Sequence, residues 1–296
     1  MQIAAILVPD FALILLGFLL VRITKWGPDF WAGMEKMVYY VLFPALLFYA
    51  TARAPLDFDT AGRLLQVAMA ALAVGIAFSW LAKPLFPREP MVFESAMQTG
   101  FRFNSYIALA VAARLGGDEG ASLMALIIGF AVPICNMAAV HAMVHRSGGL
   151  VKELARNPLL IATVAGILLN VVGGIIPDIA GSVLSRMGNA AIALGLIAVG
   201  AGLRLDGAQE AGSIGAYLLT VKLLILPATA LLLGRWMDLS TLQLQIVVMF
   251  CALPTASSAY VLATRMGGRG AMVAFLVSSG TLLSVVTLPL WLSLVT

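Results

Sequence analysis

Two stretches half a chain apart repeat one pattern: "NSYIALAVAARLGG" runs from Asn104 to Gly117, and "TASSAYVLATRMGG" runs from Thr255 to Gly268. At an offset of 151 residues, five identical residues recur: Ala108, Ala112, Arg114, Gly116 and Gly117 match Ala259, Ala263, Arg265, Gly267 and Gly268. A second set recurs at an offset of 149: Gly17, Pro28, Asp29, Leu56 and Asp57 match Gly166, Pro177, Asp178, Leu205 and Asp206. Two near-equal offsets favour an internal duplication over chance similarity.

The composition identifies the class of protein. Of 296 residues, 61% are hydrophobic and 11% are charged, with a mean hydropathy of +1.02. A soluble domain carries about 25% charged residues to face water, so this chain is a polytopic membrane protein. Its two cysteines, Cys135 and Cys251, are too few for a disulfide framework or a thiolate metal site, and we interpret them as small buried hydrophobes. The first apolar run, from Ile3, is interpreted as a retained span and not a signal peptide.

Apolar stretches long enough to cross a bilayer, which takes roughly 20 helical residues, number ten. They are residues 3–23, 34–52, 62–83, 92–114, 120–144, 158–176, 181–203, 213–235, 242–264 and 270–295. Loops after the odd spans hold eleven Lys and Arg, and loops after the even spans hold four. The bias predicts that both termini lie outside the cytoplasm and that the linker 146–157 is cytoplasmic. The net charge of +4 is interpreted as a record of this topology, with no nucleic-acid partner.

The linker divides the chain into two five-helix repeats, residues 1–145 and 158–296. Because each half has an odd number of spans, the second half enters the membrane inverted. Inverted repeats are typical of secondary transporters, whose substrate sites lie near the midplane where helices are interrupted. Interrupted backbone is tolerated there only when it lines a cavity or is buried in protein.

The repeated stretches fall in the fourth and ninth spans, where both sequences indicate a helix break. In the ninth span, Pro254 removes a backbone donor, and the hydroxyl residues Thr255, Ser257 and Ser258 follow it. A simple proline kink is the alternative. In the fourth span the break is predicted near Gly100, with Asn104 and Ser105 after it.

Arg102 lies in the middle of the fourth span, where a charged residue is expensive and indicates a functional site. Its planar guanidinium suits a carboxylate in bidentate geometry. Glu94, Gln98 and Arg102 share one helical face, so the alternative is an internal pair in which Glu94 neutralises Arg102 directly or through Gln98. We predict that Arg102 lines the translocation pathway.

Candidates for coupling to an ion are fewer. Asp10 and Glu94 are the acidic residues available for proton coupling, although Asp10 can equally be an interfacial carboxylate. Sodium coupling would use oxygen ligands such as Asn136, for which interhelical hydrogen bonding is the usual role. Uniport is a third possibility. Lys222 lies deep in the eighth span without an identifiable partner.

Several motifs in this order resemble the auxin efflux carrier family, which includes the plant PIN carriers and many bacterial organic-acid permeases. They are "VPICN" (132–136), "NPLLIATVAGILLN" (157–170), "LGLIAVGAGL" (194–203) and "LPTASSAYVLATRMGG" (253–268). In the resemblance, Asn104 matches the family's span-four asparagine and Pro254 its span-nine proline. The family's Gly and Pro after that asparagine are absent from "NSYIALA".

The resemblance implies a fold like that of sodium/proton antiporters and bile-acid symporters, with crossed helices four and nine. Helices 1, 2, 6 and 7 would form a scaffold domain, and helices 3, 4, 5, 8, 9 and 10 a transport domain that moves as an elevator. It also implies a bacterial inner-membrane location and a homodimer formed through the scaffold.

These features predict a secondary active transporter that moves a small organic anion, malonate-like or another carboxylate, by alternating access. The expected substrate-binding residues are Arg102, Asn104, Ser105, Thr255, Ser257 and Ser258, with the helix breaks at Gly100 and Pro254. No catalytic residue, enzyme activity, metal site or cofactor is expected, beyond Na⁺ or H⁺ as the coupling ion. A channel, a uniporter and a receptor with a transporter-like core are the alternatives.

Overall fold

The structure is a computed structural model that describes residues 2–53, 58–87, 89–143, 158–204, 207–265 and 267–295. The predicted linker 146–157 lies outside the described residues, as do Leu56, Asp57, Leu205 and Asp206 of the second repeat match. Within the described ranges, all regular secondary structure is helical.

Helices occupy each range in which the hydropathy predicts a span. They are α1 (Gln2–Ile23), α2 (Pro28–Met37), η1 (Val38–Leu42), α3 (Phe43–Ala52), α4 (Phe58–Leu85), α5 (Pro90–Ala96), η2 (Met97–Gly100), α6 (Ser105–Met143), α8 (Pro158–Val171), α9 (Asp178–Ala201), α10 (Ala208–Thr220), η3 (Val221–Ile225), α11 (Leu226–Trp236), α12 (Thr241–Ala252), α13 (Ser258–Arg265) and α14 (Gly270–Ser293). Five helical segments of the described chain are long and apolar enough to cross a membrane. One of them, Pro90–Ala139, contains the predicted fourth span and most of the predicted fifth.

The glycines of the repeated pattern end the helices that precede them. In α6, Gly116 and Gly117 leave helical geometry, and Gly117 has a φ of +55°. After α13, Gly267 has a φ of +73°. Residues other than glycine rarely adopt a positive φ. The glycines therefore let the chain turn sharply before the next helix begins. The positive φ falls on the second glycine of the first pair and on the first glycine of the second pair.

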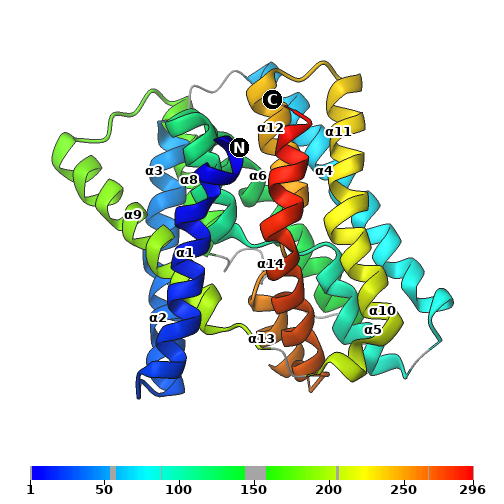
Figure 1. Ribbon diagram of the computed structural model, residues 1–296. Helices are drawn as coiled ribbons and strands as arrows, with labels where there is room; N and C mark the ends of the chain where they lie inside the picture. The colour runs from blue at the N-terminus through cyan, green and yellow to red at the C-terminus, as the bar shows by residue number, and fades with distance from the viewer. Residues whose placement is uncertain are drawn as a thin grey trace.

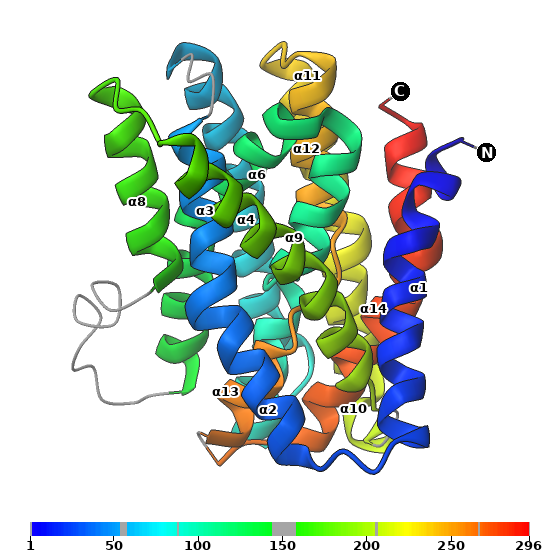
Figure 2. The same ribbon diagram turned by 90° about the vertical axis from the view of Figure 1, so that its left-hand side faces the viewer.

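The helices pack in two groups. In the first, α1 packs against α9, and α3 packs against both α8 and α9 (Figure 2). The approach of α1 to α9 is close, because a Cβ at Gly17 would lie 1.9 Å from the carbonyl oxygen of Ile197. In the second group, α12 contacts α4, α11 and α14, and α10 contacts α14. Helix α6 contacts members of both groups.

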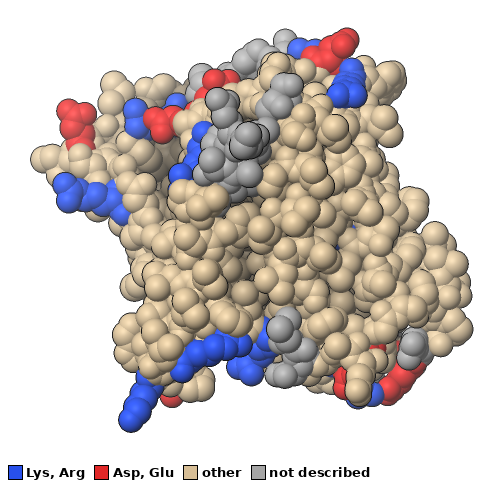
Figure 3. Space-filling view, in the orientation of Figure 1, with Lys and Arg blue, Asp and Glu red and all other residues tan. Residues whose placement is uncertain are grey.

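The distribution of charge fits a protein that crosses a bilayer. On the face that Figure 3 shows, charged side chains gather at the two ends of the molecule and leave a broad uncharged band between them. Both chain ends lie at the same end of the helices (Figure 1). Among the described residues, the charged side chains that are buried are Asp10, Arg102 and Lys222. Each therefore needs a specific partner, because burying an unpaired charge is costly.

Candidate functional site: two adjoining helix interruptions

The first interruption separates α5 from α6. After Ala96 the chain tightens into the 3₁₀ segment η2, and residues 101–104 lie outside any helix. Asn104 then starts α6, because its side-chain oxygen accepts hydrogen bonds from the backbone N–H groups of Tyr106 (3.0 Å) and Ile107 (3.2 Å). The break therefore forms without the Gly and Pro of the family pattern, by an asparagine N-cap.

The second interruption separates α12 from α13. Leu253 has an extended backbone, with φ −61° and ψ 145°, and residues 253–257 lie outside any helix. A simple kink would keep the helix on both sides of Pro254, whereas here the helix stops at Ala252 and begins again at Ser258. The extended stretch frees backbone groups that the other interruption uses.

The two interruptions contact each other directly. The backbone N–H of Asn104 donates to the carbonyl oxygen of Pro254 at 2.8 Å. The hydroxyl of Thr255 donates to the carbonyl oxygen of Thr99 at 2.7 Å. The side-chain amide of Gln98 donates to the carbonyl oxygen of Ala259 at 3.2 Å. These bonds satisfy polar groups that neither broken helix satisfies alone.

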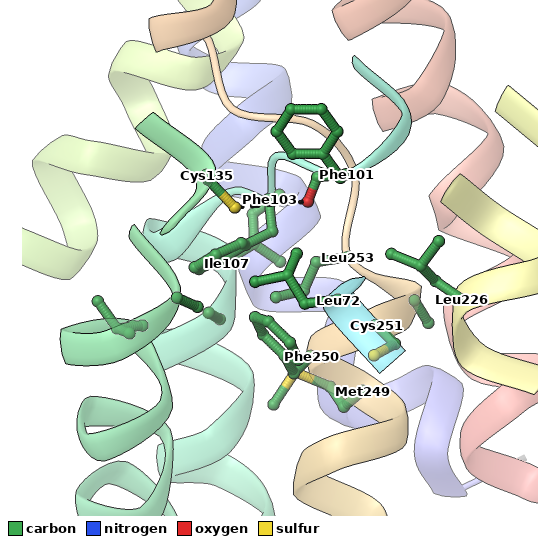
Figure 4. Packing of buried hydrophobic residues seen from close by; sticks show 14 of the residues in the cluster. Leu72, Phe101, Phe103, Ile107, Cys135, Leu226, Met249, Phe250, Cys251 and Leu253 are labelled. Atoms are coloured by element: carbon green, nitrogen blue, oxygen red, sulfur yellow. Dashed lines mark hydrogen bonds between the residues drawn. The ribbon is translucent and has the colours of Figure 1, made fainter. Parts of the chain in front are cut away.

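An apolar layer supports this junction (Figure 4). The ring of Phe103, from the first interruption, meets the ring of Phe250, from the end of α12, edge-on with centroids 4.7 Å apart. The buried thiol of Cys135 lies 3.8 Å from the carbonyl oxygen of Phe101. Both cysteines are free and buried, as the sequence predicts. Gly100 permits close packing here, because a Cβ at this position would lie 2.2 Å from the Ser79 hydroxyl oxygen.

Arg102 lies within the first interruption and is 8% exposed. Its guanidinium donates to the side-chain oxygens of Asn136 (2.8 Å), Ser258 (3.1 Å) and Gln98 (3.2 Å). All three partners are neutral, and no carboxylate in the described part of the chain forms an ion pair with Arg102. The described part of the structure therefore contains no direct ion pair between Glu94 and Arg102, which was one alternative that the sequence left open.

A second donor belongs to the same interruption as Arg102. The side-chain nitrogen of Asn104 is buried and has no hydrogen-bond partner among the described residues. Around these groups Ser105 and Ser257 are half-buried, and Ser258 is exposed. The junction thus holds one buried cation and one unpaired amide donor near an accessible edge. This combination suits an anionic group with more than one oxygen.

Asp10 lies away from the interruptions. Its carboxylate accepts hydrogen bonds from the Arg114 guanidinium at 2.9 to 3.1 Å, in bidentate geometry. The carboxylate is 4% exposed and the Arg114 side chain 38% exposed. Arg114 is about 15 Å along the helix from Asn104 at 1.5 Å per residue. Asp10, for which the sequence allows an interfacial carboxylate or a proton carrier, is thus half of an ion pair between α1 and α6.

Lys222 has a partner that sequence reasoning could not identify. Its ammonium donates to the carbonyl oxygen of Cys251 at 3.2 Å. That carbonyl belongs to the last turn of α12, which the extended backbone around Pro254 leaves without a continuing helix. Lys222 itself lies in the π-helical segment η3. The sequence shows a lysine deep in one span and a proline break in another. No feature close to either residue indicates that the lysine binds a carbonyl at the break.

Comparison with known proteins agrees with a membrane role. Residues 139–292 match the model of a family described as "Membrane transport protein". A "Putative malonate transporter" of Rhizobium meliloti (strain 1021) is 26% identical over 302 residues, which cover 97% of this chain and 93% of the relative. The "Uncharacterized transporter YfdV" of Escherichia coli (strain K12) is 25% identical over 300 residues, covering 97% and 95%. An "Uncharacterized transporter" of Methanothermobacter thermautotrophicus is 25% identical over 292 residues, covering 94% of each chain.

Proposed function

Because this chain belongs to the membrane transport protein family, the auxin efflux carrier family that its motifs resemble, we propose that it is a secondary active transporter of a small organic anion. A malonate-like carboxylate is the proposed substrate class, and one relative of similar length is named for malonate. The proposed role is not enzymatic, in line with relatives that are named transporters.

The proposal rests on the hydrogen-bond partners of Arg102, none of which carries a negative charge. A guanidinium that is 8% exposed and bonded only to neutral groups in the described chain keeps most of its charge uncompensated. Desolvating such a charge costs several kcal/mol unless an anion compensates it. A bound carboxylate would supply that compensation, so the site favours a substrate of negative charge over a neutral or cationic one.

The roles of the neighbouring residues follow from their bonds. Arg102 would bind one carboxylate, and the unpaired amide nitrogen of Asn104 would donate to an oxygen of the same substrate. Ser105, Ser257 and Ser258 would line the accessible edge. The hydroxyl of Thr255 already donates to the carbonyl of Thr99, so we assign Thr255 a positioning role between the two interruptions.

Two glycines support the proposal of inverted repeats. A Cβ at Gly17 on α1 would lie 1.9 Å from the carbonyl oxygen of Ile197 on α9, and a Cβ at Gly166 on α8 would lie 2.6 Å from the carbonyl oxygen of Phe48 on α3. Gly17 and Gly166 are separated by 149 residues, and so are Phe48 and Ile197. One contact is therefore the counterpart of the other under the offset found in the sequence.

This symmetry and the packing in two groups support transport by alternating access. The proposed scaffold comprises α1, α2, η1, α3, α8 and α9, and the remaining helices form the transport domain that carries the junction. Inward and outward states would differ by movement of one domain against the other. The proposed location is a bacterial inner membrane with both termini outside, and a homodimer through the scaffold is the proposed assembly.

Uptake of labelled malonate and other organic acids into proteoliposomes tests the function. Sodium and proton gradients, imposed separately, distinguish coupling through oxygen ligands such as Asn136 from coupling through Glu94. We expect saturable, gradient-dependent uptake that Arg102→Ala abolishes and Arg63→Gln, an exposed arginine of α4, preserves. Wild-type uptake by Arg102→Ala at equal expression would remove the assigned role of Arg102. Non-saturable flux without counterflow would instead indicate a channel.

A further inference from the structure

A cavity lies at the end of the molecule where both termini lie, between the end of α3 and the start of α9. Its volume is about 450 Å³. The polar residues that line it are Tyr49 and Arg53 from the α3 end, and Asp178, Ser182, Ser185 and Arg186 from α9. None of these residues belongs to the junction of the two interruptions, so the transport proposal gives the cavity no role.

The charged side chains that line the cavity do not form ion pairs with one another in the described part of the chain. In the part of the chain that the structure describes, neither Arg53 nor Arg186 forms an ion pair with Asp178, although all three line the same space. Arg53 is oriented by Tyr49, whose hydroxyl accepts its hydrogen bond and whose ring lies 5.0 Å below the guanidinium. The cavity therefore presents two cations and one anion to whatever fills it.

Asp178 has an ordinary explanation by itself, because a carboxylate in the first turn of a helix stabilises the helix dipole. That explanation does not account for two arginines that reach the same cavity from different helices. A small anion alone would satisfy the arginines but would be repelled by Asp178. A ligand with both a phosphate and an ammonium group satisfies all three.

The surroundings of the cavity are apolar. Ile175 and Ile179 flank the start of α9 and are 89% and 83% exposed, and Val172 just before them is 76% exposed. A membrane protein turns such side chains toward acyl chains. The cavity therefore lies where the charged rim of the molecule meets its apolar surface, which is the position of a lipid headgroup in a bilayer.

We propose that this cavity binds a phospholipid whose headgroup carries a phosphate and a primary ammonium, as in phosphatidylethanolamine. The phosphate accepts hydrogen bonds from Arg53 and Arg186, the ammonium donates to Asp178, and the hydroxyls of Ser182 and Ser185 complete the polar lining. The acyl chains extend over the apolar surface beside α9. This inference is independent of what the junction transports.

Native mass spectrometry of the full chain in detergent tests the site. The probes are phosphatidylethanolamine, phosphatidylcholine and phosphatidylglycerol of equal chain length, with glycerophosphoethanolamine as the soluble headgroup. The test variants are Arg53→Gln with Arg186→Gln, and Asp178→Asn. Arg63→Gln is the matched control, because Arg63 is an exposed arginine that does not line the cavity.

We expect the wild type to bind phosphatidylethanolamine more tightly than the other two lipids, and the double variant to bind it about tenfold more weakly, as expected for lost charge-assisted hydrogen bonds. Asp178→Asn should lose the preference over phosphatidylglycerol, while Arg63→Gln should match the wild type. Gly181→Leu provides a second route, because a Cβ at Gly181 would have only ordinary contacts, the nearest 3.6 Å from the Tyr49 ring. A leucine there should occupy part of the cavity beside Tyr49 and weaken lipid binding without removing a charge.

Equal binding of all three lipids, or equal binding by the double variant and the control, would overturn the proposal. So would binding of glycerophosphoethanolamine as tight as that of the lipid, because the site would then take a soluble ligand. Thermal unfolding of each variant shows whether a loss of binding reflects a loss of fold.

Discussion

The backbone N–H of Asn104 donates a hydrogen bond to the carbonyl oxygen of Pro254 across 2.8 Å, and so joins two helix interruptions that are half a chain apart. The same asparagine caps α6 with its side-chain oxygen and keeps a buried side-chain nitrogen without a partner. One residue therefore starts a helix, joins the two breaks and presents a donor to the proposed substrate site.

Replacing Asn104 separates its structural role from its binding role. Aspartate caps a helix as well as asparagine does, so Asn104→Asp should keep the melting temperature near that of the wild type. It also replaces the free donor with a negative charge, and like charges at close range cost several kcal/mol. We expect anion uptake to fall below about one tenth of wild type. Uptake at wild-type level by a folded Asn104→Asp protein would contradict the assigned donor role.

The hydroxyl of Thr255 provides a test of the contact between the breaks. Thr255→Val keeps the shape of the side chain but removes the bond to the Thr99 carbonyl and leaves that buried oxygen unpaired. The expected loss of stability is about 1 to 3 kcal/mol, with reduced uptake. Thr255→Ser retains the hydroxyl and should preserve most of both. Thermal unfolding and uptake should be measured on the same preparations, and equal behaviour of Val and Ser would count against the positioning role.

The ion pair of Asp10 and Arg114 should respond asymmetrically to mutation. Arg114→Gln leaves a carboxylate that is 4% exposed without its cation, and an unpaired buried charge costs about 3 to 5 kcal/mol. Asp10→Asn leaves a cation that is 38% exposed and can be hydrated, so it should be milder. The double variant should recover part of the loss caused by Arg114→Gln. Melting curves of the four proteins measure this, and a milder effect for Arg114→Gln than for Asp10→Asn would refute the argument.

Close helix approach at Gly17 and Gly166 leads to a further prediction. An alanine at either position overlaps a backbone carbonyl that cannot rotate away, and overpacking of this kind costs about 1 to 3 kcal/mol. Gly17→Ala and Gly166→Ala should therefore lower the melting temperature, and to a similar degree if the two contacts are counterparts. Gly33→Ala in α2 is the control, since a Cβ there meets nothing within 4 Å. Unchanged melting of both test variants would exclude tight packing at these sites.

Properties that depend on local chemistry could be predicted from the sequence. Hydropathy indicated where helices form, and a proline among hydroxyl residues indicated the break near Pro254. The matching stretch in the fourth span indicated the other break near Gly100, and a deep arginine indicated a functional site at Arg102. The Gly116–Gly117 and Gly267–Gly268 pairs indicated the turns that follow the two broken helices. Each of these signals lies within a few residues of the feature that it predicts.

Contacts between distant segments could not be predicted in this way. Glu94 was a plausible partner of Arg102 by helical spacing, but the fourth span is not one continuous helix, and Arg102 instead meets Asn136 and Ser258 from other helices. Nothing in the sequence connects Asp10 with its partner, Arg114, because the two are 104 residues apart. Lys222 had no identifiable partner because the partner is a backbone carbonyl, which any residue carries.

By itself, the sequence determined that this protein is a helical membrane protein and predicted two helix interruptions, because span length, apolar composition and proline geometry act within one segment. The tertiary structure alone decided that the interruptions touch, that Arg102 is buried among neutral groups in the described chain, and that the amide of Asn104 is unpaired. Which polar groups remain for a substrate depends on what every neighbouring helix supplies. That is known only when the helices are packed.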